Sequence, residues 1–445
     1  MVATAIMSVW CGDRQSTLTY LCHHHKNARG LIINPSGISR VGSVTPTAQA
    51  DSNGVARRNV WVLAVCQALS MTGTSMVMTI SALAGLVLAE DKTLATVPLA
   101  LQFTATMATT IPASLLMARI GRRAGFTFGQ TLGFAGGGLA CWSIFQGDFW
   151  MFACASLLLG AHIAFWQYYR FAAADTAGPE YRAKAISYVL AGGVVAAILG
   201  PQISKWTVDL FDPVLFAGGY AAIMVLSSLT IVLLQGVRIP NPTVKRLAGG
   251  RPISEIVRQP TFILALMSAM LGYGVMTLVM TATPLAMTNC GFSFSTMATV
   301  IQAHILAMFA PSFFTGNLIR RFGVINIIIA RSVLNISAMA INLSGTNVAN
   351  FTGGLIMMGL GWNFMFIGGT TLVTETYRSD EQAKVQATND FLVFGTTAVA
   401  SFSSGALHAK LGWSAVNMML AVPMILVFVA AVWFKISYSE RRSSG

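Results

Sequence analysis

The chain has 445 residues, of which 55% are hydrophobic and only 10% are charged. Soluble globular proteins carry about 25% charged residues, so this composition excludes a soluble globule and indicates a protein whose solvent is lipid. A mean hydropathy of +0.66 supports the same conclusion. The net charge of +13 would also suit a polyanion-binding surface, and the distribution of that charge decides between the two interpretations.

Residues 1–57 differ from the rest of the chain, because they are rich in Ser, Thr, Asn and Gly. This composition predicts a cytoplasmic tail without fixed structure. His23, His24 and His25 follow Cys22, but such a cluster in a disordered tail is a weak metal signal. We expect no metal site and no cofactor.

The remaining chain consists of long apolar runs. A bilayer core of about 30 Å requires roughly 20 apolar residues per helix, and in that unit the chain predicts an all-α membrane protein of twelve transmembrane helices. The predicted spans are 60–88, 94–117, 125–146, 149–173, 186–208, 214–236, 261–287, 296–318, 325–345, 350–373, 389–409 and 413–435.

Basic residues are distributed unevenly around these spans. If the first helix starts inside, only Lys92, Lys205 and Lys410 of the 28 basic residues fall outside. This asymmetry is the positive-inside rule, and it predicts a multi-pass protein of the cell (inner) membrane with both termini cytoplasmic. Orientation alone accounts for the positive charge, so we expect no nucleic-acid partner.

Several landmarks recur about two hundred residues apart. A basic signature follows the second and the eighth spans, and an acid–threonine pair follows the fourth and the tenth. The matching positions are Arg119, Gly121, Arg122 and Arg123 with Arg320, Arg321 and Gly323, and Asp175 and Thr176 with Glu375 and Thr376. The repeat predicts two six-helix halves, 58–236 and 261–437, of the same topology. A cytoplasmic linker, 237–260, joins them, and a cytoplasmic tail, 438–445, follows.

Across residues 58–437 these features resemble the major facilitator superfamily. In that family the loop after the second helix carries a glycine, an acid, an arginine, a glycine and two basic residues. The corresponding residues here are Ser114, Ala118, Arg119, Gly121, Arg122 and Arg123, then Gly316, Arg320, Arg321 and Gly323. The acid is absent from both copies. The resemblance implies a secondary transporter that works by alternating access, and not an enzyme.

In the family, the missing acid pairs with an arginine in a cytoplasmic gate. We therefore expect a substitute gate, in which Asp175 bridges to Arg119, Arg122 or Arg123, and Glu375 bridges to Arg320 or Arg321. The alternative is that each acid lies in headgroup water and each arginine serves only as a topology anchor.

Polar groups near the middle of a span are costly in lipid, so their positions indicate where a solute binds. His162 is thirteen residues from both Phe149 and Asp175, which places it near mid-membrane. Its equivalent in the second half is Trp362, followed by Asn363, and His304 has Gln102 as its equivalent. The candidate solute-binding residues are His162, Trp166, Tyr169, Trp362, Asn363, Gln102, His304 and Gln67.

Proton coupling usually requires a titrating group at mid-depth. We expect no acid there, so His162 and His304 are the candidates for carrying protons. The alternatives are a hydrogen-bonded structural role for each histidine and a facilitated carrier that needs no proton. A membrane-embedded enzyme is disfavoured, because no acid accompanies either histidine.

The predicted lining is aromatic, amide-bearing and almost free of fixed charge. It suits a small, flat, largely neutral organic solute. The chain is similar in this respect to the bacterial riboflavin importers of the superfamily, so riboflavin uptake by a monomeric carrier is the expected function. The alternative is a drug/proton efflux antiporter. Gly200 and Pro201 resemble in part the glycine-proline element of that class of transporter.

Overall fold

The computed structural model describes residues 46–177, 182–237, 250–378 and 381–443. Within these ranges the chain is helical and contains no β-strand. Most of the predicted tail and half of the predicted linker lie outside the described residues. Residues 50–445 form one compact unit, and everything below concerns that unit.

The first half contains six spans in seven helices. A short 3-10 helix, η1 (Lys92–Leu94), follows the first span. The helices are α2 (Pro46–Leu88), α3 (Val97–Ile120), α4 (Arg122–Gln146), α5 (Phe149–Trp166), α6 (Tyr169–Thr176), α7 (Arg182–Thr207) and α8 (Ala217–Gln235).

The second half follows the short helix α9 (Ile253–Ile256) of the linker. Its helices are α10 (Pro260–Asn289), α11 (Phe294–Phe309), α12 (Ser312–Phe322), α13 (Val324–Leu343), α14 (Val348–Thr374), α15 (Gln382–Met419) and α16 (Ala421–Ser443).

Among the described residues, nine helices are long and apolar enough to cross a membrane, or ten if the bent pair α11 and α12 is one span. That count joins α15 and α16 into one 53-residue segment, although the chain bends at Gly412, where φ is 76°. It also omits α4, because the many glycines of α4 lower its hydropathy. With these two corrections the predicted all-α fold of twelve membrane helices is confirmed.

Several helix ends differ from the predicted spans. α2 begins at Pro46, inside the predicted tail, and α15 begins at Gln382 instead of residue 389. The predicted fourth span is divided into α5 and α6, and the eighth bends by 44° between α11 and α12. Pro311 explains that bend, because proline has no N–H for the helix ladder. The starts of α2 and α15 were not predicted because these helix ends are polar, and a hydropathy pattern detects only apolar segments.

The two ends of the bundle are distinguished by the loops that they carry. We call the end with Gly121, between α3 and α4, and Gly323, between α12 and α13, the terminal side. We call the opposite end, where α5, α11 and α14 start, the far side. There Asp148, Ser293 and Asn347 accept hydrogen bonds from the backbone N–H groups three residues ahead and cap these helices.

The two glycines of the terminal side show the repeat in the backbone. Gly121 has φ 87° and ψ 154°, and Gly323 has φ 84° and ψ 151°. Residues with a Cβ rarely adopt a positive φ of this kind, so glycine permits the sharp turn in both copies. The duplicated signature therefore encodes one turn, used twice.

A second pair of glycines shows the repeat in the packing. A Cβ on Gly160 of α5 would lie 2.1 Å from the carbonyl oxygen of Gln102 in α3. A Cβ on Gly359 of α14 would lie 2.6 Å from the carbonyl oxygen of His304 in α11. In the first half Thr106 Oγ1 also donates to the Gly160 carbonyl at 2.9 Å. Small residues at such contacts let membrane helices approach closely.

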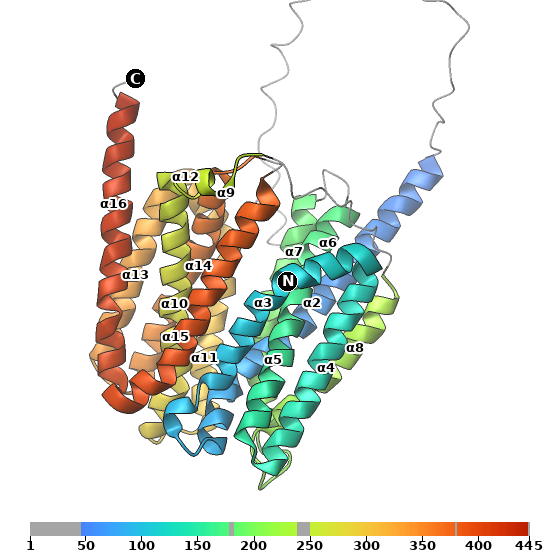
Figure 1. The fold of residues 1–445 in the computed structure, drawn as a ribbon, viewed down its shortest axis with the longest axis vertical. Helices are drawn as coiled ribbons and strands as arrows, with labels where there is room; N and C mark the ends of the chain where they lie inside the picture. Colours follow the sequence, from blue (N-terminus) through green and yellow to red (C-terminus); the bar gives the residue numbers. More distant parts are fainter. Residues whose placement is uncertain (1–45, 178–181, 238–249, 379–380, 444–445) are drawn as a thin grey trace, which may run out of the picture. The chain divides into compact units, whose positions relative to one another are not determined.

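The two halves meet along two pairs of helices. α3 packs beside α15, and α7 packs beside α11 (Figure 1). The hydrogen bonds across this boundary join far-side residues. Gln202 donates to Gln302 at 2.7 Å, Lys205 donates to Thr299 at 2.8 Å, and the Gly405 N–H donates to Thr96 Oγ1 at 3.0 Å.

The hydrophobic cores follow the same division. The largest core combines residues of both halves, such as Leu99 and Phe216 with Val300 and Leu420. Two smaller cores lie toward the terminal side, and each belongs to one half. Among the described residues the halves therefore share a core and hydrogen bonds on the far side, whereas toward the terminal side each half packs on itself.

The glycine contacts predict specific packing defects. Gly160→Ala and Gly359→Ala should each lower the free energy of unfolding by about 1–3 kcal/mol, because the new methyl group meets a backbone carbonyl that cannot move alone. Gly316→Ala is the matched control, since nothing lies within 4 Å of a Cβ built there. Thermal unfolding in detergent measures all three. Equal melting temperatures for the three variants would contradict the close approach.

Candidate functional site

His162 and Gln102 face the interior of the first half. Together with Ser70, Gln130 and Ser227 they line a small void between helices of that half, with space for about one water molecule. His162 Nδ1 lies 3.0 Å from the Gly129 carbonyl oxygen, so it carries the hydrogen and donates. Both amide atoms of Gln102 are buried and make no hydrogen bond within the described part of the chain.

His304 and Asn363 hold helices together inside the second half. His304 Nδ1 donates to the Leu355 carbonyl at 2.7 Å. Asn363 Nδ2 donates to the Met308 carbonyl and to Ser312 Oγ, each at 2.7 Å. Asn363 therefore supplies a donor where the bend at Pro311 interrupts the helix ladder.

Of three further predicted residues, Tyr169 and Trp166 pack in the core of the first half, and Gln67 is buried. The hydroxyl of Tyr169 accepts a hydrogen bond from Gln130 at 2.8 Å, and its ring meets Phe126 edge-on. Trp166 is buried, and its indole N–H has no hydrogen-bond partner among the described residues. Gln67 is buried as well, with its Oε1 atom unpaired in the same part of the chain.

Trp362 is the predicted residue that belongs to an aromatic surface near the boundary between halves. Its indole stacks on Phe366 with centroids 4.9 Å apart, and Tyr273 and Phe309 meet it edge-on. A Cβ on Gly193 of α7 would lie 2.8 Å from Phe309, which places this surface against the first half. We call Tyr273, Phe309, Trp362 and Phe366 the aromatic cluster.

A charged pair lies beside the aromatic cluster, and the sequence analysis did not identify it. Arg170 of α6 and Asp390 of α15 belong to opposite halves, and both lie within electrostatic reach of Tyr168 and Tyr273. The ring geometry agrees, because Tyr273 lies 6.5 Å from Phe394, one helical turn after Asp390, and Tyr168 donates to the Thr110 carbonyl of α3, which packs beside α15. We call these four residues the polar cluster. Asp390 was overlooked because the predicted span began at residue 389, whereas α15 begins at Gln382 and encloses it. Its proximity to Arg170 carries no sequence signal, since the two are 220 positions apart.

On the terminal side, Arg122 and Asp175 form an ion pair. Arg122 Nη2 lies 2.5 Å from Asp175 Oδ2, with side-chain exposures of 12% and 47%. The pair ties the start of α4 to the end of α6. Arg123 donates instead to Gln235 Oε1 at 2.8 Å, and Arg119 is exposed.

The second half does not repeat this ion pair. Glu375 is exposed, Arg320 donates to Asn317, and Arg321 lies over the Phe322 ring. The turn glycines explain the difference, because alignment of Gly121 with Gly323 places Val324 at the position of Arg122. The predicted bridge from Glu375 to Arg320 or Arg321 is absent among the described residues, and the position that matches Arg122 holds an apolar side chain.

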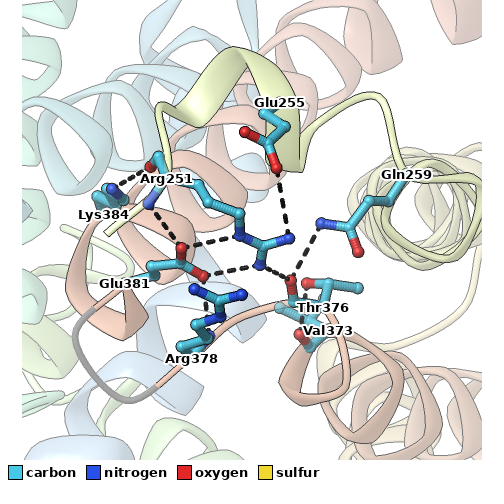
Figure 2. A network of polar contacts seen from close by, with 8 residues as sticks. All are labelled: Arg251, Glu255, Gln259, Val373, Thr376, Arg378, Glu381 and Lys384. Carbon is cyan, nitrogen blue, oxygen red and sulfur yellow. Dashed lines mark hydrogen bonds and ion pairs between the residues drawn. The ribbon is translucent and has the colours of Figure 1, made fainter. Parts of the chain in front are cut away.

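A different acid organises the terminal side of the second half (Figure 2). Glu381 accepts from Arg251 Nε at 2.9 Å and from Arg251 Nη2 at 2.8 Å. The backbone N–H groups of Arg251 and Arg378 donate to the same carboxylate at 2.7 and 2.9 Å. These hydrogen bonds hold the pKa of Glu381 well below its usual range. They fasten the end of the linker to the start of α15.

The Arg122–Asp175 pair predicts a charge-reversal experiment. Arg122→Glu should lower the free energy of unfolding by about 1 kcal/mol, because it places two carboxylates together at a partly exposed site. Adding Asp175→Arg should restore most of the loss. Arg119→Glu is the control, since Arg119 is exposed and in no described ion pair. Melting temperatures of the purified variants test this, and a double variant no better than Arg122→Glu would contradict the pairing.

The Glu381 network predicts a pH dependence. A carboxyl whose pKa is lowered by folding stabilises the protein above its unfolded pKa of about 4.3, and this stabilisation is lost as the pH falls toward the folded pKa. Glu381→Gln should therefore have a lower melting temperature than the wild type at pH 7. The difference between the two melting temperatures should become smaller below about pH 4.

Glu255→Gln is the matched control for this titration. Its carboxylate lies 3.8 Å from Arg251 and is 57% exposed, so its gap to the wild type should stay small at every pH. Melting curves recorded from pH 7 to pH 3 measure both variants. A gap for Glu381→Gln that is constant with pH would show that the carboxylate charge contributes nothing.

Comparison with known proteins supports this description. The family model of the Major Facilitator Superfamily matches residues 63–394. The chain is 41% identical to the riboflavin transporter RfnT of Brucella anthropi, over 85% of this chain and 96% of that protein. It is also 25% identical to the uncharacterized MFS-type transporter YddS of Bacillus subtilis, over 86% and 92% of the two chains.

Solved structures share the fold at low sequence identity. The crystal structure of a D-xylose-proton symporter matches with a TM-score of 0.66 at 13% identity, covering 86% of this chain and 97% of that one. The human organic anion transporter MFSD10 matches with a TM-score of 0.61, also at 13% identity, covering 84% and 99%. The chain belongs to the major facilitator superfamily, and it is a multi-pass membrane transporter of a small-molecule solute and not an enzyme.

Proposed function

We propose that this protein takes up riboflavin across the cell inner membrane by alternating access, with both termini in the cytoplasm. The observation that carries the proposal is the 41% identity to a riboflavin transporter over nearly the full length of that relative. The orientation rests on the basic residues. Lys92 and Lys205 lie near far-side helix ends and Lys410 lies near the Gly412 bend, and so few basic residues there support a cytoplasmic terminal side.

The aromatic cluster suits a flavin ring. Riboflavin combines a flat, uncharged tricyclic ring with a chain of hydroxyl groups, and flat rings gain free energy by stacking on aromatic side chains. Trp362 and Phe366 stack with an interplanar angle of 7°, so they present parallel faces. Tyr273 and Phe366 are only partly buried, which leaves them accessible to a solute.

The distribution of contacts suits the inward-facing state of such a carrier. The described hydrogen bonds between halves lie on the far side, and toward the terminal side each half has its own core. With the terminal side cytoplasmic, a solute between the halves would leave toward the cytoplasm. The Arg122–Asp175 pair and the Arg251–Glu381 network would keep each half rigid while the halves rock, and this is the gating role that we propose for them.

We propose a structural role for the two histidines, each of which joins neighbouring helices through Nδ1. A carbonyl oxygen can only accept, so His162 and His304 must each keep a hydrogen on Nδ1 to make the contacts described above. The relative at 41% identity also gives no support to the drug-efflux alternative. We therefore propose uptake without assigning a proton to either histidine.

Growth of a riboflavin-auxotrophic bacterium tests the proposal. Expression of the chain should permit growth at a limiting riboflavin concentration, and Trp362→Ala should reduce the initial rate of riboflavin uptake by about tenfold or more, as expected for the loss of a stacking partner. The control is Trp433→Ala, because Trp433 is 64% exposed in α16 and in no described ring contact. Equal surface expression of the variants must be verified by immunoblot.

Two outcomes would contradict this function. Wild-type chain that reaches the membrane without rescuing growth would exclude riboflavin uptake, and acquired drug resistance in the same host would favour efflux. If the wild type rescues growth and Trp362→Ala is fully active, riboflavin remains the proposed substrate, but the aromatic cluster is not part of its binding site.

A further inference from the structure

Arg170 and Asp390 lie at matching depths in opposite halves. Arg170 is six residues before the end of α6, and Asp390 is eight residues after the start of α15. At about 1.5 Å per residue, these positions are roughly 9 and 12 Å from the terminal ends of their helices. The aromatic cluster lies at the same level or deeper, since Phe366 is eight residues and Trp362 twelve residues before the end of α14.

The two charges are near each other without forming an ion pair. Each acts on Tyr168 and Tyr273, and the charge of Arg170 acts on Asp390 directly. Yet the ion pairs within 4.0 Å among the described residues do not include them. Arg170 Nε is buried without a hydrogen-bond partner in the same part of the chain, and Asp390 receives one hydrogen bond there, from Asn389 at 3.1 Å.

Such an arrangement is costly unless something completes it. Ionised groups at membrane depth require partners, and a buried donor without an acceptor loses free energy. A group placed between Arg170 and Asp390 would have to accept a hydrogen bond on one side and donate one on the other. The charges of the two residues cancel, so this group should itself be neutral.

We propose that Arg170 and Asp390 bind the imide edge of a flavin ring, Asp390 accepting the imide N–H and Arg170 donating to an adjacent carbonyl oxygen. The inference rests on the proposed function, because it assigns the substrate contacts of that transporter. The imide edge carries an N–H between two carbonyl groups, which is the donor and acceptor pattern that the pair lacks. Tyr273 belongs to both clusters, so the same solute can stack near Trp362.

The pairing also connects binding to movement. Arg170 and Asp390 come from different halves, so a solute held by both joins the halves on the terminal side, where the described residues form no hydrogen bond between them. Hydrogen bonds to charged groups are among the stronger ones in proteins. Bound solute would therefore favour closure of the terminal side.

The experiment compares riboflavin with riboflavin methylated at the imide nitrogen. Affinity of the purified full chain is measured by quenching of flavin fluorescence. For the wild type, methylation should weaken binding by about tenfold or more, because it removes the donor to a carboxylate. For Asp390→Ala, both ligands should bind weakly, and methylation should change affinity by less than about twofold.

Control variants separate recognition from folding. Asp209→Asn, an exposed acid of the far side, should keep the full methylation effect. Asp390→Asn preserves the shape of the side chain and should also reduce the effect, because an amide oxygen is a weaker acceptor than a carboxylate. Arg170→Gln should weaken binding of both ligands equally, since it does not face the methylated nitrogen. Elution of each variant as a single species in size-exclusion chromatography verifies folding.

The outcomes distinguish this inference from the function beneath it. Folded wild type that binds no riboflavin overturns the proposed function and the inference together. Wild type that binds both ligands equally well, or a methylation effect that persists in Asp390→Ala, overturns the inference while riboflavin transport stands.

Discussion

Each half of this transporter depends on a glycine at which one helix touches the backbone of another. Gly160 meets the Gln102 carbonyl and Gly359 meets the His304 carbonyl, at equivalent places of the repeat. Lipid provides no hydrophobic drive between helices, so such close packing and a few interhelical hydrogen bonds must hold the bundle. His304 and Asn363, two of the predicted solute ligands, form such interhelical hydrogen bonds, and Asn363 supplies donors at the bend between α11 and α12.

The boundary between the halves is built differently. Its hydrogen bonds are few and lie on the far side, where Gln202 meets Gln302 and Lys205 meets Thr299. The rest of the boundary consists of apolar contacts of the shared core. Apolar surfaces can separate without breaking hydrogen bonds, which suits the rocking of the halves that we propose. The aromatic cluster belongs to the shared core, and it is there, beside the polar cluster, that we propose the solute binds.

On the terminal side, the two halves differ in their ion pairs. The first half joins Arg122 to Asp175, whereas the second has Val324 at the matching position and uses Arg251 of the linker with Glu381 instead. Both solutions fix a helix end near the membrane surface with a charge-assisted contact. Both copies therefore have the turn glycine, whose backbone angles residues with a Cβ rarely adopt, while the ion pairs beside the two glycines differ.

The sequence alone determined the twelve helices and the duplicated signature that holds Gly121 and Gly323, because hydropathy and repeat spacing are properties of short segments. The turn at each glycine came from the structure. The sequence also placed His162, Trp362 and Asn363 at middle depth. Only the tertiary structure decided that Trp362 lies near the boundary while His162 and Asn363 turn into their own halves. Facing depends on how each helix rotates against its neighbours, and nearly uniform apolar helices carry no pattern that fixes this rotation. For the same reason, the meeting of Arg170 with Asp390 emerged only from the packed bundle.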